Sequence, residues 1–178
     1  MNTQLLLNNL RNIPDFPIPG IQFKDVSTLF KNPDCIEEML NELYLRYKDK
    51  GITKVVGIES RGFVIGAMLA TKLKCGFVMC RKPGKLPAAT IQESYNKEYG
   101  TDTVEIHFDA INNEDVVLIH DDLLATGGSM LAAHKLVEKF HPKDIYINCI
   151  IELKIEGLEG RKFLGEDKKL DVLLEINE

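Results

Sequence analysis

The sequence has no tryptophan, no C-x-x-C pair and no apolar run near the roughly 18 residues that suggest a membrane span. Its four cysteines, Cys35, Cys75, Cys80 and Cys149, lie far apart. They indicate neither a zinc site nor a disulfide framework, so we expect reduced and mostly buried thiols. The first residues lack the basic flank and long apolar core of a signal peptide. We therefore expect a soluble, cytoplasmic protein without membrane contact.

An excess of positive charge is also missing. The chain has 22 Lys and Arg residues against 27 Asp and Glu residues, with a formal net charge of -5. This argues against a partner that is nucleic acid, because neutralising phosphates requires a basic face. A local basic pocket is compatible with the composition. The 178 residues are enough for one substantial core, so we expect a single domain over residues 1–178.

Apolar runs with strand character alternate with segments of helical spacing. Strands are predicted at 54–59, 75–82, 115–122, 144–153 and 170–176, and helices at 63–73 and 129–140. Continuous apolar strands that alternate with helices are typical of a parallel sheet covered on both faces. The fold class is therefore α/β, with a central parallel sheet flanked by helices.

Two segments depart from this alternation. Residues 82–111 are rich in Pro, Gly, Thr and charge, and only 103–107 alternates as a strand does. A loop of this length inside a compact domain is usually functional, so we expect a small hood or flexible loop. The first third of the chain has a predicted helix at 3–12, a Pro-rich turn at 13–20 and a second helix at about 33–48.

The stretch VVLIHDDLLATGGSM, residues 116–130, leads a buried-looking strand into a glycine-rich turn. Thr126 and Ser129 offer hydroxyls, Gly127 and Gly128 permit close backbone approach, and the next helix presents unpaired N–H groups. Open α/β sheets bind ligands at this end of their strands, so the turn predicts a phosphate site. It matches neither G-x-x-x-x-G-K-[ST] nor G-x-G-x-x-G, the patterns of nucleoside triphosphate and dinucleotide sites.

Asp121 and Asp122 end the predicted strand, although their charges would repel a phosphate. They must face hydrogen-bond donors or positive charge, such as sugar hydroxyls or Mg²⁺. A ribose 5-phosphate, with its terminal phosphate near a diol, meets both demands. The alternative is that the acids only cap a turn while the glycines end the strand, since both residue types are common there. Their joint occurrence in this order favours a binding site.

This segment resembles the phosphoribosyl diphosphate (PRPP) signature of the type I phosphoribosyltransferases. Further stretches resemble the members that act on adenine: DFPIPGIQFKD (15–25), GIESRGFVIG (57–66), RKPGKLP (81–87) and SYNKEYGTD (94–102). The resemblance implies the type I phosphoribosyltransferase fold and a purine-salvage reaction in which adenine and PRPP give AMP and pyrophosphate. It also implies Mg²⁺ held mainly by the substrate, with no protein metal site, and a homodimer.

The resemblance also implies roles for individual residues. The 5-phosphate would be held by Ala125, Thr126, Gly127, Gly128 and Ser129, and the ribose hydroxyls by Asp121 and Asp122. Pyrophosphate would be held by Ser60, Arg61, Arg81, Lys82 and Lys85, with Arg81 able to reach a neighbouring subunit's site. In an N-terminal base-recognition segment of about residues 1–32, adenine would stack on Phe23 beside main-chain groups around Gln22 and Lys24.

Catalysis is implied for Glu98 and Tyr99 of the hood, together with Arg61. On this analogy the hood, about residues 82–111, folds over the site and excludes water. Glu98 would exchange a proton with the purine imidazole nitrogens, and Tyr99 would approach the reaction centre.

Several positions depart from the family's pattern or stay outside it. Lys24 stands where many relatives have Arg, so a bidentate contact is not expected there. His120 stands where an apolar or acidic residue is commoner, and we expect neutral packing. His107, His134 and His141 have no ligand spacing and are expected at the surface or in strands.

Two alternatives to adenine transfer remain. One is a sister enzyme that uses hypoxanthine, guanine or xanthine. The other is a PRPP-sensing regulator that keeps the fold without the catalysis. Such a regulator would normally carry a nucleic-acid-binding surface, which the acidic composition does not favour.

Overall fold

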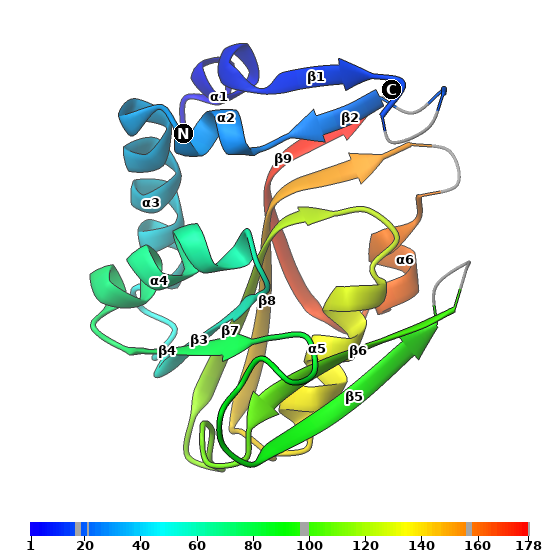
Figure 1. The fold of residues 1–178 in the computed structure, drawn as a ribbon. Helices are drawn as coiled ribbons and strands as arrows, with labels where there is room; N and C mark the ends of the chain where they lie inside the picture. Colours follow the sequence, from blue (N-terminus) through cyan, green and yellow to red (C-terminus); the bar gives the residue numbers. More distant parts are fainter. Residues whose placement is uncertain (17–18, 21, 97–99, 156–157, 178) are drawn as a thin grey trace.

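Five parallel strands form the central sheet of the computed structural model, which describes residues 1–16, 19–20, 22–96, 100–155 and 158–177 (Figure 1). All neighbouring pairs in the sheet are parallel. In spatial order the strands are β4 (Gly76–Cys80), β3 (Lys54–Ile58), β7 (Val116–Leu124), β8 (Asp144–Lys154) and β9 (Lys169–Asn177). The prediction of an α/β fold with a parallel sheet is confirmed. Because β3 and β7 are neighbours, the turns that follow them meet at one end of the sheet.

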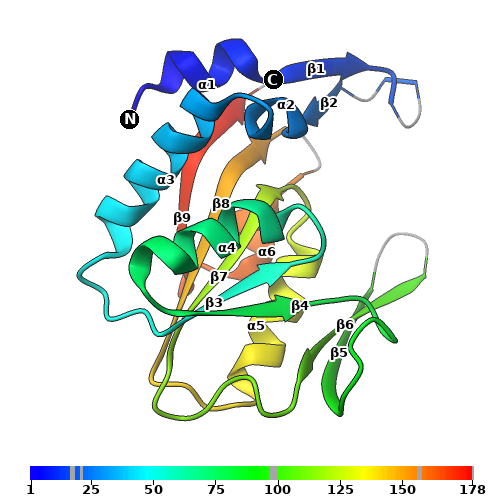
Figure 2. The same cartoon turned by 60° about the vertical axis from the view of Figure 1, so that its left-hand side comes forward.

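Helices cover both faces of this sheet (Figure 2). One face carries α3 (Pro33–Tyr47) and α4 (Gly62–Leu73), and the other carries α5 (Gly128–Glu138). The Asn32 side chain begins α3 by accepting a hydrogen bond from the Asp34 N–H at 3.0 Å, as an N-cap residue does. A short helix that the sequence did not predict, α6 (Gly160–Leu164), lies between β8 and β9.

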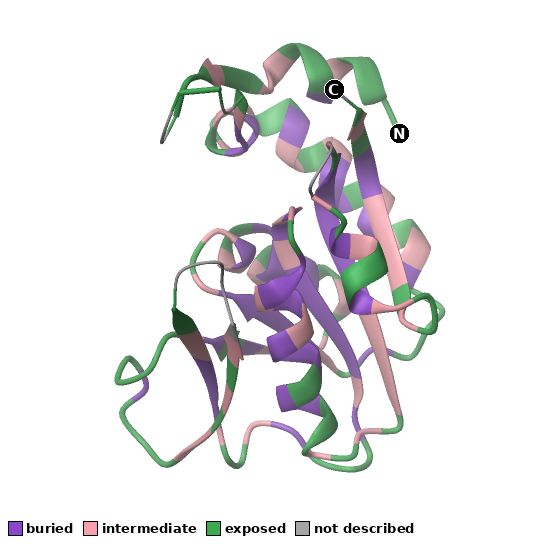
Figure 3. Ribbon diagram, turned by 90° about the vertical axis from the view of Figure 1, so that its right-hand side faces the viewer, coloured by how far each residue is buried: buried purple, intermediate pink, exposed green. Residues whose placement is uncertain are grey.

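The N-terminal elements form a separate layer above the sheet. They are α1 (Thr3–Asn9), β1 (Arg11–Pro14), β2 (Gln22–Asp25) and α2 (Ser27–Phe30). The helix predicted over 3–12 is shorter than expected, because residues 11–14 pair antiparallel with residues 22–25 instead. Figure 3 has this layer at the top and the hood at the lower left, with the buried residues of the sheet between them.

The hood leaves the central sheet, as predicted, but it contains two strands rather than one. β5 (Thr90–Asn96) and β6 (Thr101–His107) form an antiparallel hairpin. The prediction of a single strand was wrong because it missed β5, in which a polar residue occupies the packed face. Glu93 of β5 pairs with Lys139, just after α5, at 2.7 Å. A salt bridge at that position gives no apolar alternation for a sequence pattern to detect.

The cysteines and histidines largely follow expectation. All four cysteines are free thiols, and only Cys75 is not fully buried. His107 lies in β6 and His141 is exposed, but the prediction for His134 was wrong. His134 is 5% exposed because it lies on the buried face of α5, one turn from Met130. Within the described ranges, no helix has both the length and the apolar character needed to cross a membrane.

Candidate active site

A cavity of about 230 Å³, termed the first cavity, lies where the turns after β3 and β7 meet. Parallel pairing of the two strands brings together residues that are far apart in the sequence. The first cavity therefore unites most of the predicted phosphate, ribose and pyrophosphate residues. Its wall consists of Glu59, Ser60, Arg61, Asp121, Asp122, Leu123, Leu124, Ala125, Thr126, Gly127, Ser129 and Met130.

The paired acids lie inside β7 rather than at its end. The predicted strand end at residue 122 was wrong, because β7 continues to Leu124, which pairs with Glu152 of β8. Asp121 is half-buried, and Asp122 is 3% exposed. Burial raises the pKa of Asp121, with a further contribution from the charge of Asp122. The two carboxyls thus favour a ligand that donates hydrogen bonds or carries positive charge.

Arg61 compensates the buried acid. Its Nε lies 2.7 Å from Asp122 Oδ2, although this oxygen accepts no hydrogen bond from the described residues. Burial raises the pKa of Asp122, and the Arg61 charge opposes that shift. The Arg61 side chain is 41% exposed, so one cation reaches both the buried acid and the cavity.

The loop after β7 offers backbone groups to the first cavity. Gly127 has a φ of 85°, a left-handed backbone conformation that residues other than glycine rarely adopt. Helix α5 begins at the next residue, and its N-cap position makes no side-chain hydrogen bond in the described part of the chain. The first N–H groups of α5 therefore face an open site with the partial positive charge of a helix N-terminus. This geometry suits an anion.

The turn after β3 packs directly on β7. The peptide bond between Glu59 and Ser60 is cis. A Cβ at Gly62 would lie 2.8 Å from a backbone oxygen of β7 and 3.1 Å from Asp121 Oδ1. Glycine at this position therefore permits the close approach that brings Ser60 and Arg61 to the acids.

A second cavity of about 210 Å³ adjoins the first, with Glu59, Asp121 and Ser129 in both walls. It opens toward the hood rather than toward the glycine loop. The remaining residues of its wall are Ile58, Cys80, Arg81, Lys82, Tyr95, Asp102, Thr103 and Val104. The predicted cations of the 81–85 segment therefore divide, because Arg81 and Lys82 line this cavity whereas Lys85 is exposed and lines neither.

Glu59 holds Arg81 in a bidentate ion pair. The Arg81 Nε and Nη2 atoms donate to the two Glu59 oxygens at 3.2 and 3.1 Å, and the Lys82 N–H donates to Glu59 Oε2 at 2.9 Å. The hydrogen bond from Arg81 lowers the pKa of Glu59 below its usual value. Arg81 is thus engaged with this carboxylate, and an anion in the second cavity must compete for it.

The proposed base-recognition residues lie on β2, away from the glycine loop. Gln22 is exposed, Phe23 is half-buried and Lys24 is buried. The Phe23 ring centroid is 6.0 Å from the Arg61 guanidinium carbon. This contact brings the aromatic ring of the N-terminal layer to the rim of the first cavity.

Glu98 and Tyr99 lie outside the described residues, so their catalytic roles stay predictions. The strands on either side of them contribute two residues that sequence reasoning missed. The Tyr95 hydroxyl donates to Asp102 Oδ2 at 3.3 Å, and both side chains line the second cavity. Burial, with the Asp102 charge, raises the pKa of Tyr95 to about 12. Glu59 was missed too, although its place directly after β3 is where ligand-binding residues gather.

His120 is a packing residue, as expected. Its side chain is wholly buried beneath the site, and Nδ1 lies 2.9 Å from Asn148 Oδ1. Burial lowers the pKa of His120 to about 4. The imidazole is therefore neutral at pH 7 and does not balance the charge of the neighbouring acids.

Fold and site together define a class of enzyme. The chain belongs to the phosphoribosyl transferase family, because residues 25–171 match its phosphoribosyl transferase domain. Within this family it groups with the adenine phosphoribosyltransferases. The adenine phosphoribosyltransferase of Phocaeicola vulgatus is 63% identical over 176 residues, which cover 99% of this chain and 100% of that protein.

Solved structures agree over nearly the whole chain. Adenine phosphoribosyltransferase from Rhodothermus marinus superposes with a TM-score of 0.89 at 47% identity, covering 97% of each chain. The enzyme from Giardia lamblia, complexed with 9-deazaadenine, has a TM-score of 0.91 at 41% identity, covering 100% of this chain and 99% of its own. The predicted family and type I phosphoribosyltransferase fold are confirmed. The roles of single residues stay predictions.

Proposed function

We propose that this enzyme transfers the 5-phosphoribosyl group of PRPP to adenine in purine salvage, with AMP and pyrophosphate as products. The observation that carries the proposal is the first cavity, where Asp121, Arg61 and the 125–129 loop border one space. An anion site beside two acids fits a ribose 5-phosphate. The adenine phosphoribosyltransferases described above, one of which binds 9-deazaadenine, support adenine as the acceptor.

The two walls of the first cavity take different parts of the ribose 5-phosphate. The backbone N–H groups of residues 125–129 and the hydroxyls of Thr126 and Ser129 hold the 5-phosphate. Asp121 and Asp122 accept hydrogen bonds from the ribose hydroxyls. Cleavage of the bond at ribose C1 develops positive charge on the sugar, as in glycoside cleavage. Nearby carboxylates stabilise that charge.

The pyrophosphate of PRPP extends from the first cavity toward the second. Ser60, Arg61 and Lys82 are proposed to bind it, and Arg81 joins them when it exchanges Glu59 for the ligand. Lys85 contributes through charge, since it already lowers the pKa of Glu59. The Asp121 carboxylate at the junction offers the hard oxygen that Mg²⁺ prefers. Mg²⁺, bound mainly to PRPP, would neutralise the leaving pyrophosphate.

The N-terminal layer and the hood are proposed to enclose the base. Phe23 stacks on adenine, and main-chain groups around Gln22 and Lys24 read its edge. A carbonyl that accepts from the 6-amino group would be unpaired with hypoxanthine, at a cost of about 1–3 kcal/mol. Glu98 and Tyr99, with Arg61, form the proposed catalytic set at the reaction centre.

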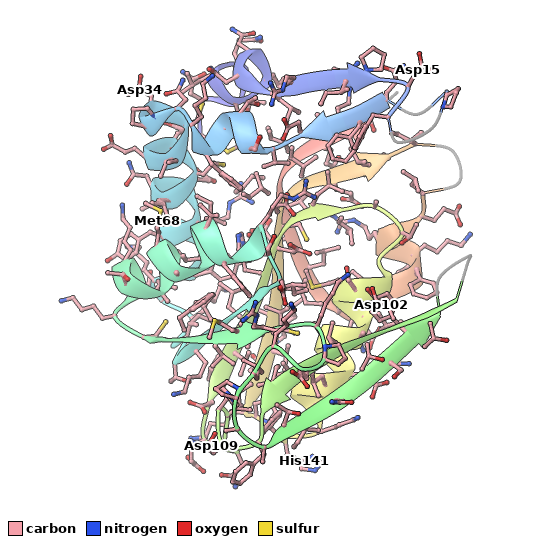
Figure 4. The ribbon with its side chains drawn as sticks, in the orientation of Figure 1. Asp15, Asp34, Met68, Asp102, Asp109 and His141 are labelled. Atoms are coloured by element: carbon pink, nitrogen blue, oxygen red, sulfur yellow. The ribbon has the colours of Figure 1, made fainter. Side chains whose placement is uncertain are left out.

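We propose a cytoplasmic homodimer, as family likeness implies. Three large apolar side chains are exposed on α4 and the edge strand β4: Val64 at 39%, Met68 at 40% and Met79 at 42%. Met68 lies on the outer side of α4 (Figure 4). Exposed apolar surface of this kind suits a second copy of the chain. The four free thiols fit a reducing compartment.

The test is a panel of adenine, hypoxanthine, guanine and xanthine, each with PRPP and with or without Mg²⁺. Formation of AMP alone, dependent on Mg²⁺, is the expected result. Transfer to another purine in preference would identify a sister enzyme. Binding of PRPP without transfer to any base would identify a regulator.

A further inference from the structure

A backbone contact behind the first cavity fixes the shape of the glycine loop. A Cβ at Gly160, the first residue of α6, would overlap the Ala125 backbone oxygen and would lie 3.0 Å from Leu124 Cγ. A Cβ at Gly127 would lie 2.7 Å from the Gly160 backbone oxygen. The loop and the start of α6 therefore touch without room for a side chain on either partner. Figure 1 shows α6 beside the beginning of α5.

An ion pair locks α6 in this position. Arg161, the residue after Gly160, donates from Nε to both Glu152 oxygens at 3.0 and 3.1 Å, and from Nη2 to Glu152 Oε2 at 2.6 Å. Glu152 is 3% exposed. Bidentate pairing of an arginine with a carboxylate fixes direction as well as distance.

The ion pair and the backbone contact form a closed circuit around the loop. Glu152 lies in β8 directly opposite Leu124, the last residue of β7. The circuit runs from Leu124 across the sheet to Glu152, through Arg161 to Gly160, and back to the loop. Each link is a contact between neighbouring residues, so a displacement of the loop would strain or break at least one of them.

Stability alone does not explain a charged pair at this place, where the Glu152 carboxylate is buried and the Arg161 side chain is 42% exposed. The partner charge roughly offsets the desolvation of the buried carboxylate, and an apolar residue of similar volume often serves as well or better. What an apolar pair cannot supply is a directional contact. The circuit therefore points to positioning of the neighbouring loop.

We propose that Glu152, Arg161 and Gly160 are positioning residues that hold the 125–129 loop, through its residues Ala125 and Gly127, in the shape that binds the 5-phosphate common to PRPP and AMP. None of the three is among the residues that line either cavity. The inference rests on the proposed role of residues 125–129 in binding this phosphate. Loosening the circuit raises KM for PRPP and for AMP in the reverse reaction, while KM for adenine and kcat at saturating PRPP stay unchanged.

Ribose 5-phosphate, which carries neither base nor pyrophosphate, is the probe for calorimetric titration. Arg161→Gln alone leaves a buried carboxylate unpaired and can unfold the protein, so the variants are Arg161→Lys and the double variant Glu152→Gln/Arg161→Gln. Both should weaken ribose 5-phosphate binding by about ten- to hundred-fold, the scale of a small misplacement of a binding group. Circular dichroism before titration verifies that each variant is folded.

Arg46→Gln is the matched control. Arg46 likewise pairs with carboxylates, Glu42 at 2.8 Å and Asp171 at 2.7 Å, but it lies between α3 and β9. Its loss should leave ribose 5-phosphate affinity within twofold. Equal losses in the Arg46 and Arg161 variants would overturn the inference, because the effect would then be general destabilisation.

Thr126→Ala/Ser129→Ala separates this inference from the proposed function. Weaker ribose 5-phosphate binding in this variant, together with unchanged binding in both folded Arg161 variants, would overturn the circuit alone. Unchanged binding in the Thr126→Ala/Ser129→Ala variant would overturn the proposed 5-phosphate site and the inference with it. Weakening in both sets, with KM for adenine unchanged, is the expected result.

Discussion

The two cavities share a wall, but backbone groups form much of the first, whereas side chains form most of the second. Backbone shapes the first: Gly127 takes a left-handed turn, and Gly62 and Gly160 permit close contacts. Charged and polar side chains shape the second, and they already pair with one another. Glu59 holds Arg81 at 3.1 Å, and Lys82 Nζ lies 3.8 Å from Asp102 Oδ2. The loop side of the first cavity is thus preformed for a phosphate, although Arg61 in the same wall is paired with Asp122. In the second cavity, Arg81 must exchange its partner before it binds an anion.

This difference assigns the two sides of PRPP different tasks. Backbone N–H groups at a helix N-terminus bind a phosphate without giving up another contact. Arg81 gains a pyrophosphate only by losing a carboxylate, so the net gain is smaller than the contact itself. Binding at the first cavity should therefore anchor the substrate, while binding at the second requires Arg81 to leave Glu59 for the pyrophosphate.

Asp122→Asn tests the preformed cavity and should have the largest effect. The substitution removes a buried charge that pairs with Arg61 at 2.7 Å and that faces the developing positive charge on the ribose. Turnover should fall on the order of 10²-fold. Steady-state kinetics measure this, with Asp115→Asn as the control, because Asp115 is buried at the other end of β7. A rate within a factor of two of the parent enzyme would contradict the role of Asp122.

His120 tests whether the stability of the packing beneath the first cavity depends on a neutral imidazole. Its folded pKa is about 4, whereas an unfolded imidazole titrates near ~6.5. Between these values the unfolded chain binds a proton that the folded protein does not, so the free energy of unfolding falls as the pH falls. The loss attributable to His120 should be on the order of 2–3 kcal/mol over this window.

Urea unfolding at pH 7, 6 and 5 compares the parent protein with His120→Gln and with His141→Gln, whose exposed side chain serves as the control. The difference between the parent and His120→Gln should shrink toward low pH. A constant difference from pH 7 to pH 5 would mean that His120 is not held neutral.

Sequence reasoning succeeded where a feature is local and failed where it depends on neighbouring strands. The parallel sheet and the 125–129 loop follow from a strand, a turn and a helix that are consecutive in the chain. The ion pair of Glu59 with Arg81 requires β3 and β4 to be adjacent, so no local pattern contains it. β5 was missed because Glu93 occupies its packed face, and β7 was ended too early because charged residues inside a buried strand look like its boundary.

A comparison of Gly127→Ala with Gly51→Ala separates the cost of a left-handed backbone conformation from the effect on ligand binding. Both glycines have positive φ, 85° and 68°, but a Cβ at Gly51 meets nothing within 4 Å, whereas one at Gly127 meets the Gly160 backbone oxygen. Both variants should lose about 1–2 kcal/mol of stability from the left-handed conformation, and Gly127→Ala should lose more, because its Cβ would lie 2.7 Å from the Gly160 backbone oxygen. Only Gly127→Ala should also raise KM for PRPP, by about tenfold. Equal KM values in the two variants would deny the loop its binding role.

Glu59→Gln tests the exchange in the second cavity and should have the smallest effect. The amide releases Arg81, so pyrophosphate should inhibit more strongly, by roughly the several-fold that a partly exposed ion pair represents. Glu93→Gln is the control, since its partner Lys139 lies outside both cavities. Weaker or unchanged inhibition by pyrophosphate would show that Glu59 does not compete with the ligand.

The same ion pair predicts a pH signature. Arg81 lowers the pKa of Glu59 below the ordinary value of 4.5. The ion pair therefore contributes fully to the free energy of unfolding above pH 4.5, and this contribution is lost as the pH falls through the lowered pKa of the folded protein. The free energy of unfolding of the parent should therefore exceed that of Glu59→Gln by about 1 kcal/mol at pH 7. The two free energies should converge once the pH has fallen through the lowered pKa of Glu59. If the two free energies converge at low pH, the contact between Glu59 and Arg81 in the second cavity depends on charge and can be exchanged for an anion. The contacts of the glycines in the first cavity depend on packing and should not change with pH.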